Sequence, residues 1–412
     1  MVHEEEQKPK ENDLRTVFAL GFVSFFTDVS TEMVFSILPT FILTLSGGSL
    51  AVLGFIEGLA EALSYGLRSI SGIFADRFRR RKLMVLIGYG FSNATKPFFA
   101  VASTATDALF IRVGDRVGKA IRTSPRDVLL SEAVSDKKMG TAFGIHRTLD
   151  HLGGIVGPIL ASALMLLFGF GMREVFWFSF IPGIIALILI LFFVKEKVSK
   201  SSNQTKFMQG VKTVLTRDFS LLLVVVGLFS LGAFDFSFVL LKASAANVEA
   251  ALIPIVYAII NVSQTVVAIP AGQLSDKIGR EKVLLLGYVT FLVSSALIGL
   301  QLGNALYIFP VAFIFGIYLG IVDPIQRAIV PRYAPAELKG TAYGIYYLTV
   351  GVALLVANTA VGALWQYMNI SAAATYSCIT SGIGIVCMIL FLRRKKQAQS
   401  SVTSSTGIIE TR

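Results

Sequence analysis

The sequence predicts an all-α membrane protein with twelve transmembrane helices in two pseudo-symmetric six-helix bundles. Three observations support this fold class. Of the 412 residues, 54% are hydrophobic and only 15% are charged, whereas about a quarter of the residues in a soluble protein are charged. Twelve apolar runs have about the 20 residues that a helix needs to cross a bilayer. Two short motifs also recur at a constant distance along the chain, which indicates two equivalent halves.

The apolar runs are separated by short polar turns, and one longer polar stretch divides them into two sets of six. In chain order they lie at residues 17–43, 51–75, 83–103, 106–130, 140–168, 174–194, 218–243, 248–274, 283–302, 305–331, 340–366 and 371–392. The predicted parts are an N-terminal tail, a first bundle, a linker, a second bundle and a C-terminal tail, at residues 1–16, 17–194, 195–217, 218–392 and 393–412.

Two polar segments carry expectations of their own. In the linker, Phe207, Val211 and Leu215 recur at helical spacing among basic residues, which predicts a short amphipathic helix on the inner membrane face. A plain flexible linker is the alternative. The C-terminal tail is basic and then rich in Ser and Thr, a composition typical of disorder.

Basic residues gather in the even-numbered turns, and this pattern sets the expected orientation. The formal net charge is +11, but Lys and Arg are confined to turns between apolar runs, so we exclude a nucleic-acid partner. Because cytoplasmic loops hold the excess of Lys and Arg, both termini are predicted to be cytoplasmic in a multi-pass plasma-membrane protein. The residues that carry this pattern include Arg77, Arg79 to Lys82, Lys137, Lys138, Lys277, Arg280, Lys282, Arg332 and Lys339.

The N-terminal segment and the cysteines predict neither a signal peptide nor a disulfide or metal site. Met1 to Arg15 carries charges of both signs and precedes a run too long for a signal core, so no cleavable signal peptide is expected. Cys378 and Cys387 lie in the last apolar run, where we expect neither a disulfide nor a metal site. No cofactor is expected.

Two pairs of segments repeat with the same offset of 200 residues. Ser71–Lys82 reads SGIFADRFRRRK and Ala271–Lys282 reads AGQLSDKIGREK, while Gly140–Ile145 reads GTAFGI and Gly340–Ile345 reads GTAYGI. Two agreeing offsets at matching places indicate a tandem duplication with parallel halves. This plan predicts a pseudo-twofold axis along the membrane normal and a substrate site at the midplane between the halves.

The turn after the second run, with its echo after the eighth, resembles the loop signature of the major facilitator superfamily, and the resemblance covers roughly residues 17–392. Arg79 stands where the family usually has Gly, whereas the second copy keeps Gly279. In the fourth run, Arg112 to Ala120 is similar to the family pattern RxxQGxGxA. It departs from that pattern at Asp115 and Arg116.

The fifth run contains Gly153, Gly157 and Pro158 at the spacing GxxxGP, which resembles a signature of proton-coupled drug exporters. Ala161 and Ser162 replace its last two glycines, and Asn358 stands at the repeat position of Pro158. The resemblance implies that this helix packs closely on a neighbour and seals the outer half of the protein. Simple helix packing is the alternative.

The two repeated turns pair acidic with basic residues. Asp76 with Arg80, and Asp276 with Arg280, are predicted to form charge networks that close the cytoplasmic side and that break and re-form during transport. Basic turns that merely anchor the inner face are the alternative.

Buried acids form the candidate coupling site. Asp28 and Glu32 are four residues apart, as are Glu57 and Glu61, so each pair shares one helix face. At about 1.5 Å of rise per residue, five acids fall near mid-membrane, namely Asp28, Glu32, Glu61, Asp115 and Asp150. Arg112 and Arg116 are the expected counter-charges. Protonation of Asp28 or Glu32 in competition with substrate would couple export to inward proton flow. Static ion pairs that orient helices are the alternative.

Other polar residues inside the runs have secondary expectations. His146 is interpreted as a hydrogen-bonding residue at a helix interface, Asp323 and Arg327 are expected to pair, and Asp235 is expected to face the cavity. The second half otherwise holds few buried charges, which predicts a more apolar substrate wall there.

The leading hypothesis is a secondary active transporter that exports a small molecule by proton antiport and works as a monomer in the lipid bilayer. Export of a metal ion or metal chelate, or uptake of a solute, remains open. A membrane enzyme is disfavoured because no nucleophile elbow, HExxH or phosphate-loop motif is present. A receptor is disfavoured because no sizeable soluble domain is present.

Overall fold

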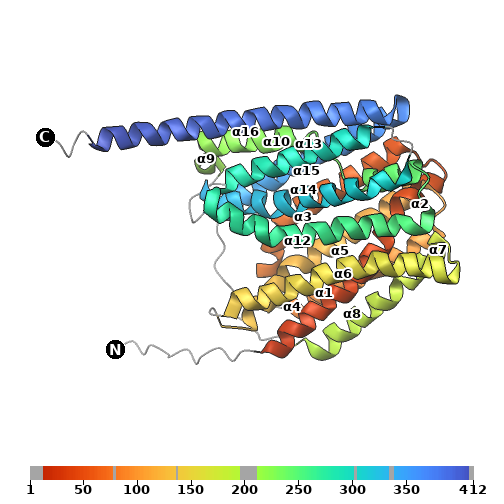
Figure 1. The fold of residues 1–412 in the computed structure, drawn as a ribbon. Helices are drawn as coiled ribbons and strands as arrows, with labels where there is room; N and C mark the ends of the chain where they lie inside the picture. The colour runs from red at the N-terminus through yellow and green to blue at the C-terminus, as the bar shows by residue number, and fades with distance from the viewer. Residues whose placement is uncertain are drawn as a thin grey trace, which may run out of the picture. The chain divides into compact units, whose positions relative to one another are not determined.

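The computed structural model describes residues 13–77, 80–135, 138–194, 211–300, 304–333 and 338–407 (Figure 1). These ranges are helical almost throughout and contain no strand, apart from one isolated parallel bridge between Ser46 and Thr104. The predicted all-α class is therefore confirmed.

The α-helices follow the predicted apolar runs closely. In chain order they are α1 (Leu14–Phe35), α2 (Leu38–Thr44), α3 (Leu50–Arg77), α4 (Arg81–Thr95), α5 (Ala105–Glu132), α6 (Met139–Phe168), α7 (Met172–Phe178), α8 (Phe180–Phe193), α9 (Val211–Val214), α10 (Arg217–Ser230), α11 (Ser237–Ala245), α12 (Ile253–Ile278), α13 (Arg280–Gly299), α14 (Ile308–Ile329), α15 (Lys339–Tyr367) and α16 (Ile370–Gly407). Short 3-10 helices are η1 (Lys96–Val101), η4 (Ala250–Leu252), η5 (Ala305–Tyr307) and η6 (Val330–Arg332).

Side-chain caps fix where several helices begin. Asp13 accepts the backbone N–H of Thr16 at the start of α1. Thr104 and Asp107 form a reciprocal capping box at the start of α5, and Thr216 accepts the N–H of Phe219 in α10. Each cap satisfies backbone donors that the first helical turn leaves without a partner.

Within the described residues, nine helical segments are long and apolar enough to cross a membrane, so the count of twelve spans remains a prediction. Three predicted runs fall outside the nine. Run 83–103 bends from α4 into η1, run 106–130 is the charged helix α5, and run 218–243 is split between α10 and α11.

Two expectations about polar segments change. Of the predicted amphipathic linker helix, the structure contains α9, four residues long, while residues 195–210 lie outside the described part. The expected disorder from Arg393 onward is wrong as far as Gly407, because α16 continues through this stretch. Arg394 contacts Asp218 and Lys395 contacts Glu281, and these ion pairs attach the basic part of the tail.

Contacts divide the chain into two units that interleave in the sequence. Unit 1 comprises Met1–Gly47, Leu67–Gln204 and Ala250–Ala258, and unit 2 comprises Gly48–Gly66, Thr205–Glu249 and Ile259–Arg412. The start of α3 thus belongs to unit 2, and the start of α12 belongs to unit 1. The first residues of these two helices are about 200 positions apart in the sequence, so they are equivalent positions of the repeat. Each unit therefore contains this one helix segment from the other half of the sequence. The predicted division at 17–194 and 218–392 stays a prediction.

Polar residues face inward and apolar residues face outward on the long helices. On α16, Ser377 and Ser381 are fully buried, whereas Ile379, Ile383 and Val386 are exposed. Exposed apolar side chains at helical spacing, with buried serines on another face, suit a helix whose outer surface meets lipid.

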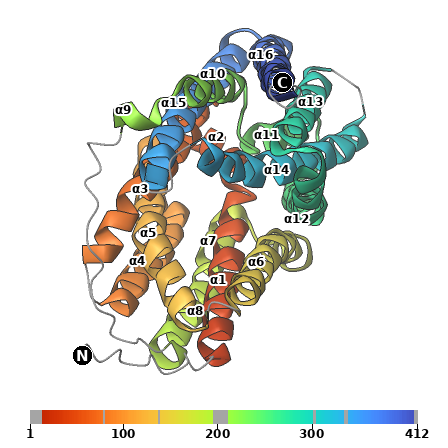
Figure 2. The same cartoon turned by 90° about the vertical axis from the view of Figure 1, so that its left-hand side faces the viewer.

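In unit 1, α1 packs against both α6 and α8 (Figure 2). Its apolar core includes Val17 and Leu20 of α1, Tyr89 of α4, Leu130 of α5 and Ile190 of α8. This core supports the charged side chains that lie farther along the same helices.

Candidate functional site

Two glycines bring α6 into backbone contact with α1. A Cβ atom on Gly153 would lie 2.4 Å from the carbonyl oxygen of Phe25, and one on Gly157 would lie 2.7 Å from that of Val29. No side chain fits in either place, so both positions require glycine. Pro158 follows directly, and α6 continues past it to Phe168. The predicted motif therefore lies against the helix that carries Asp28 and Glu32.

A similar close approach joins α4 to α5. A Cβ atom on Gly118 would lie 2.7 Å from the backbone nitrogen of Ser92. This approach lets the Ser92 hydroxyl donate to Asp115 Oδ1 at 2.6 Å. Arg116 Nη2 lies 3.3 Å from Asp115 Oδ2, and both residues are buried. The pair that departs from the family pattern is therefore an ion pair within one helix.

Arg112 is buried, with only 2% of its side chain exposed. Its guanidinium carbon lies 3.7 Å from the ring centroid of Phe35, and that of Arg116 lies 5.0 Å from the same ring. The ring face of Phe35 attracts both cations. The last residue of α1 thereby holds two arginines beside the acids of its own helix.

Lys96 is a buried cation that the sequence analysis did not single out. Its side chain is fully buried at the start of η1. The Nζ atom donates to Asn93 Oδ1 at 2.8 Å, to Ser30 Oγ at 3.2 Å and to the carbonyl of Thr27 at 3.5 Å. These acceptors tie η1 to α1 next to Asp28.

Asp28 and Glu32 face a mixed set of charges. Asp28 lies within electrostatic range of Asp150, Lys119, Glu32 and Arg122. Glu32 lies within range of Lys119, Arg116 and Arg112 and hydrogen-bonds with Tyr257, which belongs to the start of α12. The expected counter-charges Arg112 and Arg116 are therefore present, together with Lys119 and Arg122. We call the following residues the charged cluster: Asp28, Glu32, Lys96, Arg112, Asp115, Arg116, Lys119, Arg122 and Asp150.

Asp150 links the cluster to α6. The Ser24 hydroxyl of α1 donates to Asp150 Oδ1, and Arg147 Nη1 lies 3.6 Å from Oδ2. His146 is buried, and its Nε2 atom makes no hydrogen bond within the described part of the chain. The predicted interface hydrogen bond of His146 is therefore not found at that atom.

Glu61 belongs to unit 2, where it accompanies a second group of acids. Glu57 and Glu61 lie within electrostatic range of Asp235, in the segment between α10 and α11. The backbone N–H of Asp235 donates to Asn358 Oδ1 at 2.8 Å, and Glu57 is buried. Buried charge in unit 2 therefore comes from the start of α3 as well as from the second half of the sequence.

Asp323 and Arg327 of α14 form the predicted ion pair, which confirms that expectation. Tyrosines lie close by, because the Tyr343 hydroxyl donates to the carbonyl of Arg327 at 3.0 Å. The Tyr347 ring lies 5.8 Å from that of Tyr343 and 5.7 Å from that of Tyr65. These tyrosines thus lie beside the ion pair, and the more apolar substrate wall expected in the second half stays a prediction.

The four predicted gate residues differ in exposure and in bonding. Arg280 donates from Nη1 to the carbonyl of Ala328 at 2.6 Å, whereas Asp276 and Arg80 are exposed. Among the described side chains no ion pair joins Asp276 to Arg280, and the side chain of Asp76 lies outside the described part. Gly279 precedes α13 with φ at +99°, a value that favours glycine at this turn.

The chemistry of the charged cluster suits charge movement. Each isolated charge inside a membrane costs roughly 2.5 to 3.5 kcal/mol, and here acids and cations lie close enough to offset that cost. Within the described residues, no group of three or more His, Cys, Asp or Glu side chains is placed to hold a metal ion. A proton gained or lost by one carboxylate would change the balance of the whole cluster.

The family model of the Major Facilitator Superfamily matches residues 20–262 and 222–409. The chain belongs to this superfamily. An uncharacterized MFS-type transporter of Methanocaldococcus jannaschii is 34% identical over 374 residues, which cover 87% of this chain and 92% of that protein. The suspected family is thus confirmed, and the protein is an MFS transporter.

More distant relatives include a named efflux pump and a named multidrug resistance protein. The multi-drug resistance efflux pump PmrA of Streptococcus pneumoniae is 25% identical over 87% of this chain and 93% of its own length. Multidrug resistance protein 2 of Bacillus subtilis is 21% identical over 69% of this chain and 72% of its own length.

Among solved structures, the nucleoside transporter NupG (D323A mutant) has a TM-score of 0.76 at 14% identity. It covers 92% of this chain and 99% of its own. At this identity the likeness concerns the fold, which agrees with the all-α architecture of this MFS transporter.

Proposed function

We propose that this MFS transporter exports a small molecule in exchange for protons by alternating access. The observation that carries the proposal is that Asp28 and Glu32 of α1 both lie within electrostatic range of Lys119. The helix α6 is in backbone contact with this same part of α1. A proton on either carboxylate removes a negative charge and weakens its attraction to the cations of α5. The efflux pump and the multidrug resistance protein among the relatives support export as the direction.

Alternating access requires contacts that break and re-form. In unit 2, a Cβ atom on Gly54 of α3 would lie 2.2 Å from the carbonyl oxygen of Asn358 in α15. In unit 1, the Ser162 hydroxyl of α6 donates to the carbonyl of Ala251 at 2.6 Å. Each contact joins a helix of one sequence half to a helix of the other. We propose that separating these helices exposes the substrate to the opposite side of the membrane.

The remaining features of the proposal concern placement. Both termini lie in the cytoplasm, the bilayer is the plasma membrane and the transporter acts as a monomer. The turns that contain Asp76 with Arg80 and Asp276 with Arg280 close the cytoplasmic side. Basic residues in every even-numbered turn support this orientation.

Transport in inside-out vesicles with an imposed pH gradient tests the coupling. The panel of solutes contains lipophilic cations, antibiotics, divalent metals and siderophore-like chelates. We expect substrate-induced proton release by the wild type and a loss of at least about tenfold in Asp28→Asn or Glu32→Gln, because a neutral amide cannot exchange a proton. Glu174→Gln, at an exposed acid of α7, is the matched control and should transport normally.

Two outcomes would decide against the proposal. Transport that ignores the gradient and survives both α1 substitutions would make the buried charges structural ion pairs. Accumulation of solute only in right-side-out vesicles would make the protein an uptake permease. The divalent metals in the panel also test metal export. Across the described part of the chain, no group of three or more His, Cys, Asp or Glu side chains is placed to bind such an ion.

A further inference from the structure

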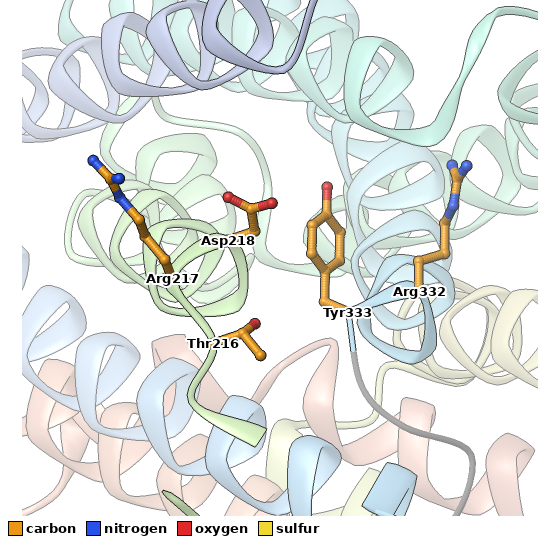
Figure 3. A pocket seen from close by; sticks show the side chains of 5 residues that line it. All are labelled: Thr216, Arg217, Asp218, Arg332 and Tyr333. Atoms are coloured by element: carbon orange, nitrogen blue, oxygen red, sulfur yellow. The ribbon is translucent and has the colours of Figure 1, made fainter. Parts of the chain in front are cut away.

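A pocket of about 580 Å³ lies in unit 2. It is lined by Thr216, Arg217, Asp218, Arg332 and Tyr333 (Figure 3). The first three residues begin α10, and the other two end the η6 turn after α14. Its volume is typical of sites for small molecules, and its lining is polar and charged.

The acids near this pocket already have cationic partners. Asp218 Oδ1 lies 3.7 Å from Arg394 Nη2, and its side chain is 66% exposed. Glu281 of α13 bonds the lining residue Tyr333, and Lys395 Nζ contacts its Oε1 at 2.5 Å. Two cations of α16 thus neutralise the two carboxylates.

The arginines are less engaged than these acids. Arg332 Nη1 lies 3.7 Å from Glu281 Oε2, farther than Lys395 lies from Oε1, and half of the Arg332 side chain is exposed. Arg217 is exposed and makes no hydrogen bond or ion pair within the described part of the chain. In Figure 3 the two arginines flank the pocket, with Asp218 and Tyr333 between them.

Tyr333 adds a neutral donor to the lining. Its hydroxyl donates to Glu281 Oε1 at 2.9 Å and accepts from Lys395 Nζ at 3.1 Å. Burial and the neighbouring Glu281 raise the pKa of Tyr333 well above its usual range, so the hydroxyl stays neutral. The pocket therefore contains one acid, Asp218, between two arginines and the start of α10, where the helix dipole also favours an anion.

The repeat explains why only the second half places a guanidinium here. In the first half Arg81, at the start of α4, forms an ion pair with Glu132, at the end of α5. The positions 200 residues later are Glu281 and Arg332, so the same pair recurs with its charges exchanged. This exchange moves the arginine to the η6 turn, opposite Arg217. It also gives Lys395 an acid to contact.

We propose that this pocket binds a phosphate group, held between the guanidinium groups of Arg217 and Arg332. Arginine binds phosphate oxygens through paired, charge-assisted hydrogen bonds. The group belongs either to the headgroup of an anionic phospholipid or to a soluble phosphate. Basic pockets between transmembrane helices suit the former when they lie at the cytoplasmic leaflet.

Thermal unfolding of the purified full-length protein in detergent tests the site. Phosphatidylglycerol, phosphatidylcholine and inorganic phosphate are titrated separately, at a salt concentration near 0.15 M that screens diffuse attraction. We expect phosphatidylglycerol or inorganic phosphate to raise the unfolding midpoint, and phosphatidylcholine to do so far less. Whichever of these two probes raises the unfolding midpoint at the lower concentration identifies the source of the phosphate group.

Substitutions separate this site from general charge effects. Arg217→Gln and Arg332→Gln should each weaken the apparent Kd about tenfold. Asp218→Asn should tighten it several-fold, because it removes the only acid of the lining and frees Arg394. Lys277→Gln, at an exposed cation of the same unit, is the control and should bind as the wild type does.

Wild-type affinity in both arginine variants, or equal stabilisation by phosphatidylcholine and phosphatidylglycerol, would overturn the proposal. Tighter binding by Asp218→Asn is a gain that misfolding does not produce. The readout is ligand binding, so failure of proton-coupled export would leave this test unaffected.

Discussion

At the scale of single residues, Lys96 offers a direct test of how the charged cluster is held. Its ammonium group has three acceptors from α1 and the end of α4. Lys96→Met keeps most of the side-chain volume but leaves those acceptors without their donor. A buried polar group without a partner costs about 1 to 3 kcal/mol. We therefore expect the unfolding midpoint in detergent to fall by several degrees.

The control for this substitution is Lys138→Met, which neutralises an exposed cation at the start of α6. Its unfolding midpoint should match that of the wild type. An unchanged midpoint in Lys96→Met would mean that the ammonium group contributes nothing net to the packing of η1 on α1.

The sequence predicted that Asp28 and Glu32 share one helix face, but it did not predict their neighbours on other helices. Counting helical rise places Asp28, Glu32 and Glu61 near mid-membrane, and that depth stays a prediction. The count says nothing about which helix each one faces, and Glu61 belongs to unit 2 beside Asp235. Lys96 was missed because one lysine before a proline in an apolar run resembles a lysine that reaches to the interface.

At the scale of helices, adjacent glycines of α6 provide a matched pair of substitutions. A Cβ atom on Gly153 would clash with the carbonyl oxygen of Phe25, whereas one on Gly154 would meet nothing within 4 Å. Gly153→Ala should force α6 away from α1 and cost roughly 1 to 3 kcal/mol. Gly154→Ala should be neutral or stabilise by up to about 1 kcal/mol, since alanine favours the helix.

Unfolding midpoints of the two alanine variants, measured side by side, check this expectation. If Gly153→Ala were as stable as Gly154→Ala, α6 and α1 would not be in backbone contact in the protein. The test is also informative for transport, because Gly153 contacts the turn of α1 that carries Asp28.

Helix positions followed from hydropathy, but helix breaks did not. The run at 218–243 is apolar almost throughout, yet the chain leaves the helix between α10 and α11, where Asp235 bonds Asn358 and Ser237. Such a break depends on partners far away in the sequence. The continuation of α16 past Arg393 likewise depends on Asp218 and Glu281, which no local pattern connects with it.

At the scale of the whole molecule, the repeat determines which helix segments are exchanged. The offset of 200 residues was visible in two motifs, and the same offset relates the starts of α3 and α12, each found in the unit formed mainly by the other half. The sequence predicted the duplication but not this exchange, because the motifs lie at helix ends and the exchanged segments are plain apolar helix. The exchange of charges between the Arg81–Glu132 pair and the Glu281–Arg332 pair was also missed. A search for repeats looks for identical or similar residues, and it therefore passes over positions where an acid replaces a base.

The exchange in unit 2 allows a test of alternating access. A Cβ atom on Gly351 of α15 would lie 3.3 Å from the Cα atom of Ala62 in α3, and a disulfide needs Cβ atoms about 3.5 to 4.5 Å apart. In a background where Cys378 and Cys387 are serine, Ala62→Cys with Gly351→Cys should cross-link on mild oxidation. In the proposed cycle α3 leaves α15 when the substrate path reverses, so oxidation should reduce transport at least about tenfold and a reductant should restore it. The single variant Gly351→Cys controls for the added side chain and should be insensitive to oxidation. Full transport by the cross-linked protein would show that this contact stays closed throughout the cycle, and the moving contact would then have to be sought elsewhere.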